Sequence, residues 1–148
     1  MYNIAKKGVM DGTIDLDTDT IVGILCMTNT TADTEIDADT VSAITTLDEF
    51  DGSGFTWGWG NTGRKALASR AVTADDGNDR GEFDAADINW ASLGAGTRSA
   101  KGVLIVKKGA ADDTTAIPIA WVEFASPIAA NGGDLTMQID AQGLIHLT

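Results

Sequence analysis

The sequence has few of the residues from which catalytic and metal sites are most often built. Its 148 residues include one cysteine, Cys26, and one histidine, His146, which stands two positions from the end. One cysteine cannot form an internal disulfide, and one residue of each kind cannot supply a zinc-type metal site. Cys26 lies within the apolar run TIVGILCM, which predicts a buried small hydrophobic side chain rather than a nucleophile.

Long apolar runs and an excess of basic residues are absent as well. No stretch approaches the ~18 apolar residues of a membrane span, and the opening MYNIAKKGVMDG lacks the apolar segment of a signal peptide. The chain has 22 acidic residues against 10 basic ones, a net charge of −12. An acidic surface repels phosphate groups, so nucleic acid and anionic membranes are not expected as partners. We expect a protein that is made in a cytoplasm and stays soluble.

The residues that are abundant favour β structure. Aspartate outnumbers glutamate by 18 to 4, and there are 18 threonines and 17 glycines. Threonine, valine and isoleucine suit pleated strands, while aspartate and glycine suit tight turns. The length allows one domain with a proper core, and no repeat or linker divides it. The prediction is an all-β single domain over residues 13–148, a β-sandwich or barrel of the jelly-roll-like kind.

Individual segments predict short strands separated by turns. The continuous apolar run at residues 21–27 is typical of a strand buried on both faces. The turn-like sequence at residues 75–79 predicts a hairpin. Pro118 cannot donate a ladder hydrogen bond, so its strand is expected at a sheet edge or to begin there. Further strands are expected in KGVLIVKKG and TAIPIAWVEF, and a terminal hairpin in GDLTMQIDAQGLIHLT, which turns at residues 141–143.

Two segments are expected to differ from this β pattern. Residues 1–12 are interpreted as an N-terminal arm, because they mix apolar and basic residues and end in the turn signal Asp11-Gly12. Apolar residues recur at a three-residue spacing from Val41 to Phe50. This spacing, after a capping residue at position 39 or 40, predicts a short helix or helical turn.

A glycine motif at residues 57–63, WGWGNTG, matches the letters of a dinucleotide fingerprint. That fingerprint requires a buried strand before its first glycine, Gly58, and a helix after its third, Gly63. The segment before it is rich in turns, and the segment after it has no helical stripe. Arg64 follows where a P-loop would have lysine and a hydroxyl residue. We interpret the glycines as a tight turn between Trp57 and Trp59.

The acidic residues do not form a recognisable calcium or catalytic pattern. Asp15, Asp17 and Asp19 match the first ligand positions of an EF-hand loop, but Thr20 and Cys26 replace its glycine and its glutamate. The cluster at residues 75–79 is either a solvated turn or a weak Ca²⁺ site, and a catalytic carboxylate pair elsewhere is not excluded by sequence. We expect no catalytic residues, no metal ligands and no cofactor.

The four tryptophans divide into two pairs. Trp90 and Trp121 lie in apolar strand contexts and are expected in the core. Trp57 and Trp59 have the same parity, so in an extended segment both would point to one face, beside Arg64. They are interpreted as core or rim residues, as a protein interface, or as a platform for carbohydrate.

The sequence from about residue 13 to the end resembles the small proteins that tailed bacteriophages encode beside their major capsid protein. The residues that carry the resemblance are Phe83-Asp84-Ala85, Asp87, Trp90, the strand ending at Lys107, the Pro118 strand with Trp121 and Phe124, Gly132-Gly133-Asp134 and the turn at Gly143. The resemblance implies a β-rich capsid cement, decoration or head-fibre protein without enzymatic activity. It implies assembly as a homotrimer that binds the major capsid protein on the outer surface of the virion.

Two groups of residues are expected to make the capsid or intersubunit contact. The first is Trp57, Trp59, Arg64 and Lys65, which cluster at the glycine-rich turn. The second is Tyr2, Ile4, Lys6 and Lys7 in the N-terminal arm, which holds the only bases in the acidic first third of the chain. The alternative function is a virion-surface module that binds a host glycan.

Overall fold

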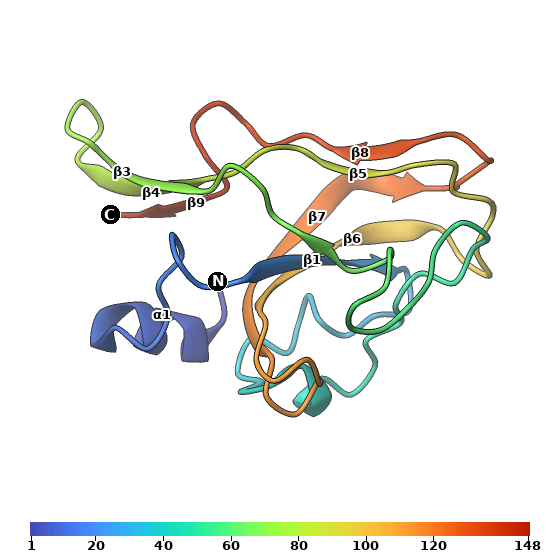
Figure 1. Cartoon of the computed structure of the whole chain (residues 1–148), viewed down its shortest axis with the longest axis horizontal. Coiled ribbons are helices and arrows are strands. Elements are labelled where there is room, and N and C mark those ends of the chain that lie inside the picture. The colour runs from blue at the N-terminus through green and yellow to red at the C-terminus, as the bar shows by residue number, and fades with distance from the viewer.

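The computed structural model describes residues 1–148, and most of its regular structure is antiparallel strands (Figure 1). The all-β prediction is confirmed. The elements in chain order are α1 (Asn3–Asp11), β1 (Ile21–Met27), the 3-10 turn η1 (Val41–Ala43), β2 (Lys65–Ala66), β3 (Ala71–Asp75), β4 (Arg80–Asp84), β5 (Ile88–Trp90), β6 (Ala100–Lys107), β7 (Ile117–Ile128), β8 (Leu135–Met137) and β9 (Ile145–Leu147).

A four-stranded sheet with the order β2-β1-β6-β7 forms the larger layer. All seven residues of β1 are buried, as its continuous apolar run predicts, because both faces of this strand are covered. β1 pairs with β6 along its whole length, with Ile24 opposite Leu104 and Leu25 opposite Val103. These pairs lie at the centre of a core of 33 buried apolar residues. β7 is the edge strand expected from Pro118, which lies opposite Val106 beside a shift in register.

Two smaller sheets, β3-β4-β9 and β5-β8, form the upper layer in Figure 1. Glycine allows the layers to approach closely, because a Cβ at Gly23 of β1 would lie 2.8 Å from the Ile88 side chain of β5. The predicted hairpin around residues 75–79 is present as β3 and β4, which pair from Ala71–Asp84 to Asp75–Arg80.

The predicted terminal hairpin is wrong, although its turn at Gly143 exists. β8 pairs with β5, with Leu135 opposite Trp90, whereas β9 pairs with β4, with Ile145 opposite Phe83. The turn therefore passes the chain from one small sheet to the other. Alternation of apolar residues identified both strands, but it does not specify which buried partner each strand selects.

The helical turn predicted after position 39 or 40 is present as the 3-10 turn η1. The arm prediction is wrong, because the one α-helix lies in residues 1–12. α1 is capped by Gly12, whose φ of 76° is favoured by glycine at a helix C-terminus. Tyr2 and Ala5 belong to the main buried cluster, and the Tyr2 amide donates to the Ile119 carbonyl of β7 at 2.8 Å. With nine residues, α1 is too short to cross a membrane.

Candidate interaction site

The glycine motif forms a closed loop at one end of the molecule. The Gly63 amide donates to the Thr56 carbonyl at 3.0 Å, and the Asn61 side chain donates to the Trp57 carbonyl at 2.6 Å. Gly58 and Gly60 have φ values of 80° and 81°, which residues with a side chain rarely adopt. The loop leads into the two-residue strand β2 and not into a helix, so the context of a dinucleotide fingerprint is not formed.

A largely buried ion network holds the end of this loop in place. The guanidinium of Arg64 lies between the carboxylates of Glu49 and Asp113, with 2.7 Å from Nη2 to Glu49 Oε2 and 3.2 Å to Asp113 Oδ2. The Arg64 side chain is only 4% exposed and that of Glu49 9%. The backbone places Glu49 through a bridge to Cys26 at the end of β1, and places Asp113 through a hydrogen bond from Ser42 to its carbonyl.

The charge of Arg64 is maintained by its two acidic partners. Burial alone would lower the pKa of Arg64, but the hydrogen bonds and charges of Glu49 and Asp113 outweigh burial and raise the pKa. Arg64 was predicted to be a surface contact residue, yet its guanidinium is occupied inside the chain. Its role in this site is to hold the loop, since a guanidinium bonded to two carboxylates has a fixed orientation.

Trp59 is the side chain of the loop that this network holds in place. Its indole Nε1 donates to Asp113 Oδ1 at 2.8 Å, and the Arg64 guanidinium carbon lies 4.6 Å from the centre of the Trp59 ring. This geometry is that of a cation–π contact. At the base of the loop, Trp90 is buried and donates from Nε1 to the Gly63 carbonyl at 2.6 Å. The loop is therefore tied to the core at two points.

Trp57, in contrast, projects into solvent with 62% of its surface exposed. The expectation that Trp57 and Trp59 share a face is wrong, because Gly58 between them has positive φ and turns the chain. One tryptophan anchors the loop and the other is presented by it. The core prediction for Trp90 is confirmed, while Trp121 is half-buried and its Nε1 has no hydrogen-bond partner. Lys65 is half-buried in β2 and forms no salt bridge.

The N-terminal candidates lie elsewhere, because α1 is at the left of Figure 1 and the loop at residues 51–63 is at the right. Tyr2 is 1% exposed, and its hydroxyl donates to the buried Ala32 carbonyl. Tyr2 therefore cannot be a surface contact in this fold, which corrects the sequence interpretation. Ile4 is half-buried against the core, whereas Lys6 and Lys7 are exposed.

Lys7 is engaged in an exposed ion pair with Asp11 one helical turn later, with 2.6 Å from Nζ to Oδ2. The hydrogen bond from Lys7, and after it those from Thr13, lower the pKa of Asp11 to about 2 from an ordinary value of 3.8. Because this pKa is lower in the folded state, the interaction is complete above about pH 4 and is lost as the pH falls toward 2. Replacing Lys7 by methionine should move the Asp11 pKa part of the way back to 3.8, as measured by NMR titration of the carboxyl carbon. An unchanged pKa would contradict the pairing.

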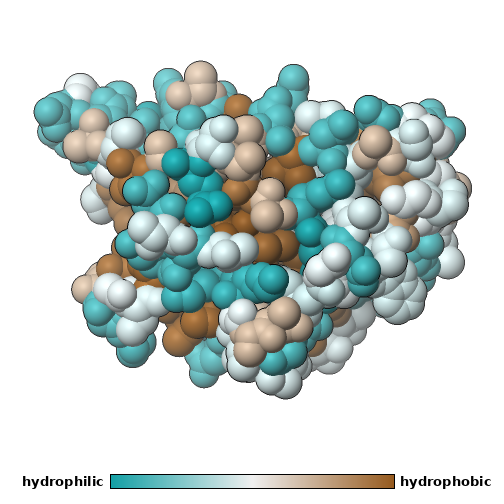
Figure 2. Space-filling view, viewed as in Figure 1, coloured by the Kyte–Doolittle hydropathy of each residue, from teal (hydrophilic) through white to brown (hydrophobic).

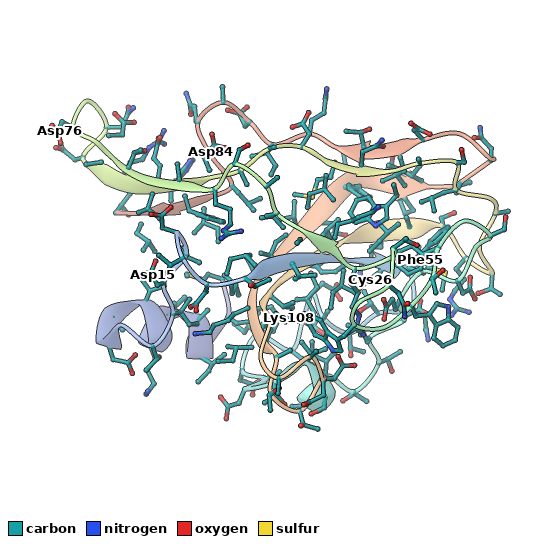
Figure 3. The ribbon with its side chains drawn as sticks, in the orientation of Figure 1. Asp15, Cys26, Phe55, Asp76, Asp84 and Lys108 are labelled. Atoms are coloured by element: carbon teal, nitrogen blue, oxygen red, sulfur yellow. The ribbon has the colours of Figure 1, made fainter.

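The acidic turns bind their own backbone. Asp75 accepts from the Gly77 amide at 3.1 Å, from the Asn78 side chain and from Arg80, so its carboxylate is already occupied within the hairpin (Figure 3 labels the neighbouring Asp76). Asp15 accepts from the amides of Asp17 and Thr18 in the same way. No three His, Cys, Asp or Glu side chains are grouped as ligands for a metal ion.

Sequence reasoning did not find Glu49 and Asp113, the two residues that make the loop rigid. They lie 15 and 49 residues from Arg64, and in the sequence each is one acid among 22. The geometry as a whole offers a preorganised exposed aromatic ring for contact with another surface. Compared with known proteins, the chain matches no protein-family model, no curated protein and no solved structure.

Proposed function

We propose that this protein is a structural virion protein of a tailed bacteriophage. In this proposal it binds the major capsid protein on the outer capsid surface, as a homotrimer, and stabilises the shell by clamping neighbouring capsid subunits. The residues that resemble phage cement proteins support it, among them Phe83-Asp84-Ala85 at the end of β4 and Trp121 in β7. The observation that carries the proposal is the rigid presentation of Trp57.

An exposed tryptophan on a rigid loop is well suited to bind a protein surface. Aromatic side chains bury a large apolar area when they bind, and tryptophan is among the residues that dominate interface energies. Association also costs side-chain and loop entropy. The network of Arg64, Glu49 and Asp113 orders the Trp57 loop before any partner is bound, so less entropy is lost on binding.

Decoration of a shell does not require each contact to be strong. Many copies act on one particle, and linked contacts reach a combined strength that none has alone. A trimer would engage its partner at three points simultaneously. A small β domain with one presented anchor fits this arrangement.

The same exposed indole also favours a second candidate, a virion-surface module for a host glycan. An aromatic ring with a free face can stack on a sugar. This function predicts saturable quenching of tryptophan fluorescence by glycans, whereas the capsid function predicts none. Quenching that Trp57→Ala abolishes, together with no binding to shells, would replace the capsid function by the glycan function.

Replacing Trp57 by alanine should weaken binding to shells of the neighbouring major capsid protein by about 30-fold or more, the effect of one hot-spot residue. The measurement is co-sedimentation of the protein with expanded shells over a concentration series. Ile36→Ala is the matched control, because Ile36 is also a large exposed apolar residue, at 48% exposure, outside the loop. Equal binding by Trp57→Ala and the wild type would contradict the role of the loop.

A further inference from the structure

An apolar groove lies below the β3-β4-β9 sheet, between this sheet and the segment that follows α1. Its volume is about 320 Å³. Brown, apolar atoms are visible beneath that sheet at the left of Figure 2, and Figure 3 labels Asp15 on the lower side of the gap and Asp84 on the upper side. The apolar side chains that line the groove are Val9, Ile14, Leu16, Val72, Phe83, Ile145 and Leu147.

The strand register explains why this side of the sheet is apolar. Val72, Phe83 and Ile145 are directly opposite one another across the three strands, and Gly81 and Leu147 form part of the next row on the same face. The centre of the face is covered, since Phe83 and Ile145 are buried. The two edges of the face are open to solvent, because Val72 is 54% exposed and Leu147 is 43% exposed. The sheet therefore leaves part of an apolar face open to solvent.

The groove carries unpaired acidic residues, whereas around the Trp57 loop Arg64 and Lys65 balance Glu49 and Asp113. Asp15 and Asp17 line the groove, and neither forms a salt bridge. No acidic residue occurs between Asp51 and Asp75, the part of the sequence that contains the loop, and Lys65 at the end of the loop also has no acidic partner. In a chain with a net charge of −12, this loop is a surface that an acidic groove can approach without repulsion.

The size of the groove also fits the exposed indole. A volume of 320 Å³ equals that of about ten water molecules in the liquid. A tryptophan side chain has about ten non-hydrogen atoms, so the groove can accommodate one indole, which would displace water from its apolar walls.

From these observations we propose that the groove of one copy binds Trp57 of a second copy. The groove lies at the left end of the molecule and the Trp57 loop at the right end in Figure 1. A contact between opposite ends is a head-to-tail interface, which closes into a ring when the rotation permits. The inference deepens the homotrimer of the proposed function and rests on it: each subunit inserts one Trp57 and receives another. Trp57→Ala would then weaken binding to shells because it dissociates the trimer and removes its three-point contact, not because Trp57 itself contacts the capsid.

Mixing two defective variants tests this arrangement. Trp57→Ala removes the inserted side chain and keeps the groove, while Val72→Asp places a charge in the groove and keeps Trp57. By light scattering, the wild type should form a species of about 46 kDa, three times the 15.4 kDa chain, and each variant alone should remain at 15.4 kDa. An equimolar mixture at high concentration should form a species of about 31 kDa, twice the 15.4 kDa chain. One intact interface then remains, and both outer ends are blocked.

The matched control is Thr73→Asp, which adds the same charge to the opposite, exposed face of β3. It should retain the mass of the wild type. Leu147→Asp is a second groove variant, should Val72→Asp lose its β circular-dichroism signal. A monomeric wild type, variants that keep the full mass, or a mixture that stays at 15.4 kDa would each overturn the inference.

Capsid binding is measured separately, by co-sedimentation of the wild type with shells. A monomer that binds shells would disprove the interface and retain the proposed function. A 46 kDa ring (three 15.4 kDa chains) that does not bind shells would support the interface and disprove the proposed function. If Val72→Asp leaves the mass unchanged, the groove does not bind Trp57 and is free for a different protein or a small apolar ligand.

Discussion

Replacing Arg64 by methionine should lower the free energy of unfolding by about 3–5 kcal/mol, because it leaves a buried charge without its partner. The Glu49 side chain is only 9% exposed and bonds to Arg64 at 2.7 Å. Methionine fills part of the space but cannot donate a hydrogen bond. The Glu49 carboxylate would then pay the cost of desolvation without compensation. Urea unfolding of the wild type and the variant measures the difference.

Two controls separate this explanation from a simple loss of packing. The double variant Glu49→Gln, Arg64→Met should recover part of the lost stability, since no buried charge remains. At the exposed Lys7–Asp11 pair, Lys7→Met should cause little change in stability. A deficit below about 1 kcal/mol would contradict a stabilising role of the network.

The same substitution should affect function through the loop. Arg64 bonds to Asp113, and Asp113 in turn accepts from the Trp59 indole at 2.8 Å. Without Arg64 the Trp59 anchor is weakened, and Trp57 would sample more conformations before it binds. The stability of the fold and the order of the Trp57 loop before binding therefore depend on the same residues.

Features that depend on burial were predictable from the sequence. The seven-residue run of β1 has only apolar residues and glycine, and a strand of this composition is stable only when both faces are covered. The β3–β4 hairpin was marked by its turn residues at 75–79. Trp90 was identified as a core residue by its apolar neighbours.

Features that depend on pairing over long distances were not predictable. Leu135 and Ile145 both alternate as strand residues should, yet they pair with Trp90 and Phe83 in different sheets. An extended segment would place Trp57 and Trp59 on one face, but the positive φ of Gly58 turns the chain and separates them. The groove below β3-β4-β9 depends on the register of three strands, which no local pattern specifies.

The N-terminal segment was expected to be an arm, but it forms the helix α1. Its mixture of apolar residues and lysines is typical of an arm, but it is also typical of a short amphipathic helix on a sheet. Ala5 and Gly8 are buried, while Lys6 and Lys7 are exposed. A Cβ at Gly8 would lie 2.6 Å from the Ile14 side chain. The helix is thus packed closely against the segment that follows it.

Replacing Tyr2 by alanine should therefore destabilise the whole protein, by about 3–5 kcal/mol, as truncation of a buried aromatic residue does. Tyr2 is 1% exposed, belongs to the main core, and donates from its hydroxyl to the Ala32 carbonyl. The arm hypothesis makes the opposite prediction: removing residues 1–11 would abolish binding to shells and leave the fold unchanged. Thermal and urea unfolding, together with circular dichroism, distinguish the two.

Conservative variants at the same end of the chain show which part of Tyr2 is responsible. Tyr2→Phe keeps the ring and removes only the hydroxyl that donates to the buried Ala32 carbonyl, so its cost should be about 1–3 kcal/mol. Met10→Ala, at a position of α1 that is 82% exposed, should change stability by no more than about 0.5 kcal/mol. If Tyr2→Ala were as mild as Met10→Ala, α1 would not be part of the core, and the lysines of an arm would again be candidates for contact with the shell. If Tyr2→Ala is severe and Met10→Ala is not, α1 is held through Tyr2 as part of the domain, and its exposed Lys6 and Lys7 could contact a shell only from a fixed helix and not from a free arm.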